Sequence, residues 1–202
     1  DEPVGLIAAS DDLRPDSSRA IASLSKQGID RQIMLTGDHE RAAKPIAEQA
    51  GVDAYHAGCT PEDKLRLLAE LESSSGSVAM VGDGANDAPA LARAAVSLSM
   101  GAAASDVAAE NADIAIMGER LLAVAEARAI ALRAKTIMRQ NLIIALGVIA
   151  TVAPLAVLGF AELGVAVVLH EGSTVVVVLN ALRLLRPASL PAIPAIPASN
   201  DG

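Results

Sequence analysis

The run Val-Gly-Asp-Gly-Ala-Asn-Asp-Ala-Pro-Ala-Leu, at residues 81–91, is the most informative stretch of this chain. An apolar segment, residues 77–81, leads into it and predicts a strand, and the proline near its end is typical of a helix start. Asp83, Asn86 and Asp87 therefore lie on a turn at the end of a strand. Two carboxylates and an amide so placed suit a hard cation with oxygen ligands, and Mg²⁺ beside a phosphoryl group is the commonest use of one. A turn rich in Asp and Asn that merely ends a strand explains only part of this run.

Strands and helices alternate along residues 1–126. Short apolar runs predict strands, and apolar residues at helical spacing predict helices. The predicted strands cover residues 4–9, 32–35, 54–56, 77–81, 95–99 and 114–117. The predicted helices cover residues 16–27, 40–50, 61–73, 89–93 and 104–109. Such alternation is typical of a parallel sheet with helices on both faces, which binds ligands at the carboxyl ends of its strands.

Two further segments carry groups that suit a phosphate. Thr36, Gly37 and Asp38 follow the predicted strand 32–35 and offer a hydroxyl, an unobstructed backbone N–H and a carboxylate. The first two are good donors to phosphate oxygens. Lys64 lies in the first turn of a predicted helix, where its ammonium could neutralise a phosphate and a nucleophilic carboxylate. Each signal has an ordinary alternative, namely a turn that ends a strand and a solvated lysine on an amphipathic helix.

The composition limits the classes of protein to consider. The chain has 202 residues, of which 52% are hydrophobic, and its mean hydropathy is +0.41, which is high for a soluble domain. A net charge of −8 argues against a nucleic-acid-binding protein. The single cysteine, Cys59, excludes an internal disulfide framework and a cysteine-based zinc site. The chain starts with Asp-Glu-Pro rather than with a methionine or a signal peptide, so we expect it to be a piece of a longer protein.

The apolar residues concentrate toward the carboxyl end. A predicted basic helix, residues 121–140, precedes two apolar stretches at about 142–160 and 163–185, each long enough to cross a bilayer. Arg139 and Arg183 flank the outer ends of these stretches, whereas the connecting loop has no basic residue. The positive-inside rule then places both ends in the cytoplasm. The alternative is a pair of helices buried in a soluble core.

Ionisable side chains interrupt the second apolar stretch. His170 and Glu171 lie near its middle, where a charge costs roughly 2.5–3.5 kcal/mol on insertion scales and therefore usually has a function or a partner. Thr174 is four residues from His170 on the same helical face, and Gly172 should weaken the helix and free carbonyl groups as ligands. Imidazole with carboxylate suits Zn²⁺, Co²⁺, Ni²⁺ or Fe²⁺, and a His–Glu hydrogen bond that only fixes helix packing is the alternative. Asn180 is expected to form an interhelical hydrogen bond.

Three motifs in order carry a family resemblance. Leu-Thr-Gly-Asp, Pro-Glu-Asp-Lys and Gly-Asp-Gly-Ala-Asn-Asp-Ala-Pro-Ala-Leu resemble the phosphorylation domain of P-type ATPases, within the haloacid-dehalogenase-like superfamily. Residues 11–15 also resemble that family's Asp-x-x-Arg segment. The resemblance implies a haloacid-dehalogenase-like, Rossmann-like α/β parallel sheet covered by helices, followed by two transmembrane α-helices. It implies the carboxyl-terminal part of a phosphorylation domain at 1–126, a linker helix and two-span hairpin at 127–186, and a disordered Pro-rich tail at 187–202.

In this family an aspartate takes the γ-phosphate of ATP and the acyl-phosphate is later hydrolysed, with Mg²⁺ as cofactor. The resemblance implies that Thr36 and Gly37 hold phosphate oxygens, with Asp38 nearer the nucleotide. It implies that Lys64 bridges the phosphate and the acceptor aspartate.

The same resemblance gives Asp83 the role of Mg²⁺ ligand, with Asn86 and Asp87 organising the site. The family's acceptor aspartate lies in Asp-Lys-Thr-Gly-Thr, and this string does not occur in the chain. We therefore expect the chain to match only the carboxyl-terminal part of such a pump, to need the missing amino-terminal part as a partner, and to be inactive alone.

His-Glu-Gly-Ser-Thr, at residues 170–174, resembles the heavy-metal-transporting branch of the family, and within it the cobalt/zinc-type subgroup. This implies a transported divalent ion such as Co²⁺ or Zn²⁺ held by His170, Glu171 and Thr174, in a multi-pass protein of the cell membrane with a cytoplasmic phosphorylation domain. The subgroup's Ser-Pro-Cys motif is absent here. A membrane-tethered phosphatase of the same superfamily and a non-catalytic remnant are the alternatives.

Overall fold

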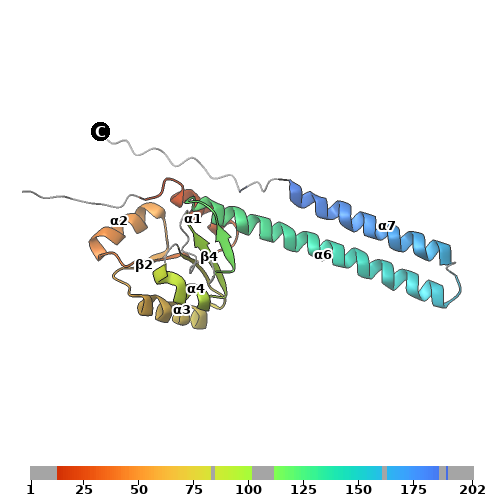
Figure 1. Cartoon of the computed structure of the whole chain (residues 1–202), viewed down its shortest axis with the longest axis horizontal. Helices are drawn as coiled ribbons and strands as arrows, with labels where there is room; N and C mark the ends of the chain where they lie inside the picture. Colours follow the sequence, from red (N-terminus) through yellow and green to blue (C-terminus); the bar gives the residue numbers. More distant parts are fainter. Residues whose placement is uncertain (1–12, 83–84, 102–111, 161–162, 187–189, 191–202) are drawn as a thin grey trace, which may run out of the picture. The chain divides into compact units, whose positions relative to one another are not determined.

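The computed structural model describes residues 13–82, 85–101, 112–160, 163–186 and 190 (Figure 1). The chain forms two compact units that meet in sequence between Ala125 and Glu126. The elements of the first unit are α1 (Ser17–Lys26), β1 (Ile33–Leu35), α2 (Glu40–Ala50), β2 (Ala54–His56), α3 (Pro61–Ser75), β3 (Ala79–Gly82), η1 (Ala85–Asp87), α4 (Ala88–Arg93), β4 (Val96–Met100) and β5 (Ile114–Ile116). Helix α6 (Leu122–Val157) begins in the first unit, and α7 (Leu163–Ala181) and η2 (Leu182–Leu185) belong to the second.

All of the strand pairs in the described part of the chain are parallel, as the alternation of elements predicts. β1 pairs with β2 in one two-stranded sheet, and β3, β4 and β5 form a second sheet in that order. The described strands thus form two separate sheets rather than the single sheet that the sequence indicates. Because β1 and β3 do not pair, each presents an edge without a strand partner among the described residues.

Helices cover both faces of the second sheet. Parallel partners point to the same face, so Met80 and its partner Ser97 face one way, and Leu98 and Met100 face the other. Met80 packs against Leu68 of α3 and Leu91 of α4, both of which are 1% exposed. The opposite face packs against α1 and the start of α6. This confirms the predicted sheet covered by helices.

Reciprocal hydrogen bonds between Ser97 and Asp113 connect β4 to the start of β5. Asp113 Oδ2 accepts hydrogen bonds from the backbone N–H of Ser97, at 2.9 Å, and from its hydroxyl, at 3.0 Å. The backbone N–H of Asp113 donates in return to Ser97 Oγ at 3.0 Å. The bonds from Ser97, the backbone one most of all, hold the pKa of Asp113 below its ordinary value because they stabilise the carboxylate.

Helix α3 begins with a capping box. Thr60 Oγ1 accepts a hydrogen bond from the Asp63 N–H at 3.1 Å, and the Asp63 carboxylate accepts from the Thr60 N–H at 3.2 Å. Pro61 occupies the first helical position, where its missing N–H is no loss. The Thr60 hydroxyl also donates to Asp63 Oδ2 at 2.8 Å, and this bond, followed by the one from the Thr60 N–H, lowers the pKa of Asp63 because both stabilise the carboxylate.

Most element boundaries lie within a few residues of those predicted. The predicted strand 4–9, the predicted helix 104–109 and nearly all of the Pro-rich tail lie outside the described residues. The basic helix and the first apolar stretch are one continuous helix, α6, of 36 residues. They join because neither Gly nor Pro separates Gln140 from Leu142.

Helix α6 ends in a Schellman motif. The Phe160 N–H donates to the Leu155 carbonyl at 2.9 Å, and the Gly159 N–H donates to the Ala156 carbonyl at 3.1 Å. Gly159 has a φ of 76°, which glycine adopts without a steric penalty. Pro154 lies inside the helix without ending it.

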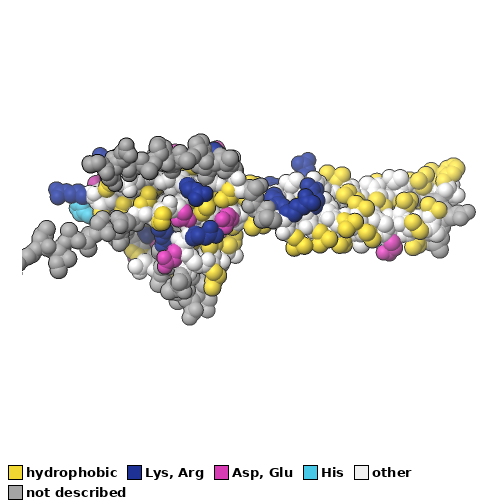
Figure 2. Space-filling model, turned by 90° about the horizontal axis from the view of Figure 1, so that it is seen from above, with side chains coloured by type: hydrophobic (Ala, Val, Ile, Leu, Met, Phe, Trp, Pro, Cys, Tyr) yellow, Lys and Arg dark blue, Asp and Glu magenta, His cyan; other side chains and the backbone are white. Residues whose placement is uncertain are grey.

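Both helices of the second unit are long and apolar enough to cross a membrane, judged by length and composition. Their most apolar windows have mean hydropathies of 1.9 in Leu122–Val157 and 1.8 in Gly164–Leu185, and neither window is buried within the structure. On the face drawn in Figure 2, apolar side chains run along this unit and Lys and Arg side chains gather at one end. The alternative of two buried core helices is therefore wrong for the described part of the chain.

Candidate functional site

An ion pair joins the start of α3 to the end of η1. Lys64 Nζ lies 2.6 Å from Asp87 Oδ1, and the two side chains are only 15% and 12% exposed. The capping box fixes the helix start that carries Lys64, whose N–H donates to the Thr60 carbonyl at 3.0 Å. A charge-assisted bond with so little exposure to solvent fixes the positions of both side chains. Two of the predicted site residues, 23 positions apart in the sequence, thus meet.

The strand end beside this pair has room only for a glycine. A Cβ atom built on Gly82 would lie 2.8 Å from both Cβ and Oδ2 of Asp87. Contacts below 3.0 Å force a shift of the neighbouring atoms. The carboxyl end of β3 therefore lies directly against the Asp87 side chain, which is buried at 8% exposure.

The Thr36-Gly37-Asp38 turn follows β1 and is internally bonded. Thr36 Oγ1 donates to Asp38 Oδ2 at 2.7 Å and accepts from the Asp38 N–H at 3.1 Å. Gly37 and Asp38 are exposed. The Thr36 hydroxyl, predicted as a donor to phosphate, thus donates to Asp38 here, because the turn brings the carboxylate two residues on within hydrogen-bonding distance.

Backbone bonds tie this turn to the chain that enters α3. The Thr36 N–H donates to the His56 carbonyl at 3.0 Å, and the Cys59 N–H donates to the Thr36 carbonyl at 2.9 Å. The residue after Cys59 is Thr60, the N-cap of the helix that carries Lys64. Among the described residues, however, no hydrogen bond joins Thr36 or Asp38 directly to Lys64 or Asp87.

The remaining members of the predicted site are less defined. Asp83 lies outside the described residues, as do Asp11 and Asp12, so their roles stay predictions. Asn86 belongs to η1 and is exposed, and its side chain forms no hydrogen bond within the described part of the chain. In the same residues no group of three or more His, Cys, Asp or Glu side chains has the geometry to hold a metal ion.

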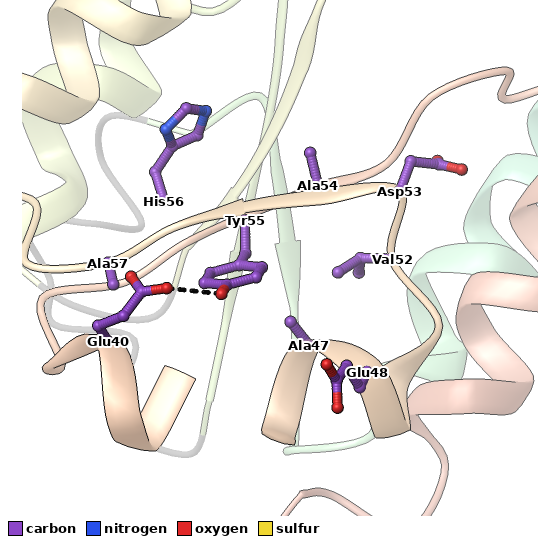
Figure 3. A pocket seen from close by; sticks show the side chains of 9 residues that line it. All are labelled: Glu40, Ala47, Glu48, Val52, Asp53, Ala54, Tyr55, His56 and Ala57. Atoms are coloured by element: carbon purple, nitrogen blue, oxygen red, sulfur yellow. Dashed lines mark hydrogen bonds between the residues drawn. The ribbon is translucent and has the colours of Figure 1, made fainter. Parts of the chain in front are cut away.

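A cavity of about 680 Å³ opens elsewhere, along β2 and α2 (Figure 3). Tyr55 and Glu40 lie on one side of β2 and His56 on the other, as a strand's alternation requires. Tyr55 Oη donates to Glu40 Oε1 at 2.6 Å, and this bond raises the pKa of Tyr55 because ionisation would break it. None of the residues predicted for phosphoryl chemistry lines this cavity.

The predicted cation ligands lie on α7, which runs unbroken through Gly172. The expected local weakening of the helix at this glycine is therefore wrong, and the neighbouring hydroxyls bond to the backbone instead. Ser173 Oγ and Thr174 Oγ1 donate to the His170 carbonyl at 2.7 and 3.3 Å. His170 and Glu171 are exposed and, within the described chain, share no hydrogen bond, so the alternative of a His–Glu packing contact is not seen.

Comparison with known proteins assigns the family. The model of the haloacid dehalogenase-like hydrolases matches residues 1–95. A probable cation-transporting ATPase G of Mycobacterium tuberculosis is 42% identical over 194 residues, which is 96% of this chain and 25% of that protein. The chain belongs to the P-type ATPases.

Two further P-type ATPases extend the comparison. A manganese-exporting P-type ATPase of Mycobacterium tuberculosis is 40% identical over 91% of this chain and 26% of its own length. The crystal structure of a zinc-transporting PIB-type ATPase in an E2.Pi state superposes with a TM-score of 0.80 at 40% identity, over 88% of this chain and 29% of that one. The chain thus spans about a quarter of the length of the curated P-type ATPases that it matches.

Polar contacts between α6 and α7 form a cluster that the sequence indicates only in part. Asn180 Nδ2 donates to Gln140 Oε1 at 3.2 Å and to Asn141 Oδ1 at 2.8 Å, which confirms the predicted interhelical role of Asn180. Arg183 Nη1 donates to Gln140 Oε1 at 3.1 Å and to Asn180 Oδ1 at 2.8 Å. Arg133 donates to the carbonyl oxygens of Arg183 and Arg186 at 2.8 and 2.9 Å. In the sequence, the feature that could have indicated this cluster is the presence of polar residues near the facing ends of both predicted helices, Gln140 and Asn141 on one and Asn180 and Arg183 on the other.

Proposed function

We propose that this chain is the carboxyl-terminal portion of an ATP-driven heavy-metal exporter that works through a phospho-aspartate. The acceptor aspartate belongs to the part of the pump outside this chain, because Asp-Lys-Thr-Gly-Thr does not occur here. The observation that carries the proposal is the Lys64–Asp87 pair, 2.6 Å apart and pressed against Gly82 at the end of a parallel strand. An ammonium and a carboxylate fixed at that edge are what phosphoryl transfer to a carboxylate requires.

In this mechanism Lys64 neutralises charge on the transferred phosphoryl group and on the acceptor. Its partner Asp87 orients the ammonium, since Asp87 Oδ1 accepts a hydrogen bond from Lys64 Nζ at 2.6 Å. Thr36 and Gly37 bind phosphate oxygens, for which the Thr36 hydroxyl must turn from Asp38 to the phosphate. Asp38, exposed beside them, faces the nucleotide.

The residues present fit a magnesium ion. Carboxylate oxygens are its preferred protein ligands. Asp87 is a buried carboxylate, and its Oδ2 lies against Gly82 at the end of β3. Asp83 is the residue that follows Gly82 in the sequence. We assign Asp83 as the direct ligand, with Asp87 and Asn86 as groups that orient it. When bound, Mg²⁺ neutralises charge on the phosphate oxygens.

The unpaired edges of β1 and β3 support a place for the acceptor strand. Parallel strands in such folds are normally flanked on both sides within the sheet. A strand between β1 and β3 would end between the Thr36 turn and the Lys64–Asp87 pair. We propose that the acceptor aspartate lies at the end of such a strand.

His170, Glu171 and Thr174 are proposed to hold the transported ion. The cost of an imidazole and a carboxylate among apolar residues favours a functional role, and this ligand set suits Co²⁺ or Zn²⁺. Similar P-type ATPases are described as manganese-exporting and as zinc-transporting at the same 40% identity, so sequence similarity alone does not choose the ion. The basic ends of both apolar helices favour a cell-membrane location with a cytoplasmic phosphorylation unit.

The test uses the complete pump that contains this chain. His170→Ala or Glu171→Ala should abolish metal-stimulated ATP hydrolysis across a series of divalent ions, while phosphorylation by inorganic phosphate persists. His56→Ala, which changes an exposed histidine far along the sequence from α7, is the matched control and should keep metal stimulation. Normal metal stimulation in both α7 variants would remove the ligand assignment.

A further inference from the structure

A second cavity lies at the basic end of the helical unit. It has a volume of about 240 Å³ and is lined by Leu132, Arg133, Thr136, Ile137 and Arg183. Lys and Arg side chains gather at one end of this unit in Figure 2. The cavity therefore combines apolar walls with guanidinium groups. This combination is typical of the boundary between the acyl chains and the headgroups of a bilayer.

Arg183 has hydrogen-bonding capacity to spare. Its Nη1 donates to two neutral amide oxygens, those of Gln140 and Asn180. Its Nη2 and Nε donate to no acceptor within the described part of the chain, although the side chain lines the cavity. No carboxylate among those residues pairs with Arg183, so its charge is balanced only by dipoles. A guanidinium edge of this kind suits two oxygens of one phosphate group.

The other cationic groups nearby also lack a carboxylate. Lys135, Arg139 and Arg186 form no ion pair within the described chain. An anion at this end would thus meet a field of several positive charges in a low-dielectric setting. An anion attached to acyl chains gains additional contact with the adjacent helix surfaces, whose apolar windows are unburied.

Thr136 adds a preference for one class of headgroup. Its hydroxyl donates to the Leu132 carbonyl at 3.0 Å, so its oxygen is left as an acceptor. An acceptor beside a phosphate suits a headgroup with hydroxyl donors. Leu132 and Ile137 close the apolar side of the cavity, with Ile137 only 5% exposed.

We propose that Arg183 and Thr136 bind the headgroup of an anionic phospholipid that carries hydroxyls, such as a phosphatidylglycerol. The phosphate accepts from Arg183 Nη2 and Nε, and a headgroup hydroxyl donates to Thr136 Oγ1. This inference rests on the proposed insertion of both helices in a membrane. It concerns a lipid ligand that the pump reaction does not itself require.

The experiment measures lipid retention by native mass spectrometry in neutral detergent, for the whole 202-residue chain and for the complete pump. Phosphatidylglycerol should be retained over phosphatidylcholine of the same acyl chains, and Arg183→Gln should weaken its binding roughly tenfold, as the loss of charged hydrogen bonds implies. Thr136→Val should weaken phosphatidylglycerol but not phosphatidic acid. Arg183→Lys keeps the positive charge but lacks the paired N–H groups of the guanidinium. This variant should bind phosphatidylglycerol at an intermediate level, which tests the site even if Arg183→Gln misfolds.

Two controls separate charge and packing from the site itself. Lys44→Gln removes a positive charge from the first unit, and Thr151→Val removes an α6 hydroxyl that bonds to the Gly147 carbonyl and does not line the cavity; both should keep the preference for phosphatidylglycerol. Equal retention by wild type and Arg183→Gln would overturn the proposal. So would displacement by inorganic phosphate, which would indicate a free-anion site, or loss of the preference in the complete pump, which would indicate that protein covers the cavity.

Metal-stimulated ATP hydrolysis in phosphatidylcholine alone, measured in parallel, keeps the two proposals apart. Hydrolysis without a lipid preference removes only the lipid site. A lipid preference without hydrolysis removes only the pump assignment.

Discussion

Lys64 Nζ and Asp87 Oδ1 lie 2.6 Å apart, and each comes from an element that another contact fixes. Lys64 stands in the capped first turn of α3, and Asp87 is held against Gly82. The backbone positions that bring the two side chains together are therefore set by contacts outside the pair. We therefore expect the pair to contribute both to the stability of the first unit and to the proposed phosphoryl transfer.

Removal of one member should destabilise the first unit. Lys64→Ala leaves the Asp87 carboxylate poorly solvated and unpaired, and we expect a loss of about 3 kcal/mol in unfolding free energy, in line with broken buried pairs. Denaturant unfolding can be followed by tyrosine fluorescence, since Tyr55 is the only tyrosine and the chain has no tryptophan. In the complete pump the same variant should lose phosphoenzyme.

Arg66→Ala is the matched control for Lys64→Ala. Arg66 pairs with Asp63 at 2.7 Å, but its side chain is 66% exposed, so the loss should be below about 1 kcal/mol. A double-mutant cycle of Lys64→Ala and Asp87→Ala should give a coupling of about 1–3 kcal/mol. Additive effects would contradict the stated coupling.

Gly82→Ala should disturb the same site by steric pressure. Its Cβ would lie 2.8 Å from Asp87 Oδ2, so the carboxylate that pairs with Lys64 must shift. Overpacking of this kind typically costs about 1–3 kcal/mol, and we expect phosphoenzyme in the pump to fall as well. Gly37→Ala is the stability control, because its Cβ would meet only the Cys59 carbonyl, at 3.6 Å. Equal unfolding free energies for the two variants would argue against a tight Gly82–Asp87 contact.

The α3 capping box should make stability sensitive to acid. The Thr60 hydrogen bonds lower the pKa of Asp63 in the folded state below its ordinary value of 3.8, so the carboxylate stabilises the fold above that pH. This contribution is lost as the pH falls from 3.8 through the folded-state pKa. The unfolding free energy of wild type should therefore exceed that of Asp63→Asn by a constant amount near neutral pH, and the difference should shrink below pH 3.8.

Thr60→Ala removes the other half of the box and should cost about 1 kcal/mol at neutral pH. It should also bring the pKa of Asp63 closer to its ordinary value, which NMR titration of the carboxyl group would detect. A pKa of Asp63 that does not change in this variant would exclude the hydroxyl as the main cause.

Local patterns predicted the individual elements well. Helix α2 and strand β2 have the predicted bounds, because each is a short periodic run ended by glycine or turn residues. The capping box was not predicted, although Thr60 and Asp63 have the spacing of its two members. Gly172 misled because an isolated glycine lowers helix propensity only slightly, and an apolar helix of 19 residues tolerates it.

The sequence by itself determined the parallel α/β order, the family motifs, and two helices apolar enough to span a membrane, because these depend on residue type and spacing along the chain. Only the tertiary structure decided that Lys64 pairs with Asp87, that Gly82 admits no side chain, and that Arg183 bonds to Gln140 and Asn180. Each of these contacts joins separate elements, or a strand end to the turn beyond it. Their distances depend on how helices and strands pack, which spacing in sequence does not encode.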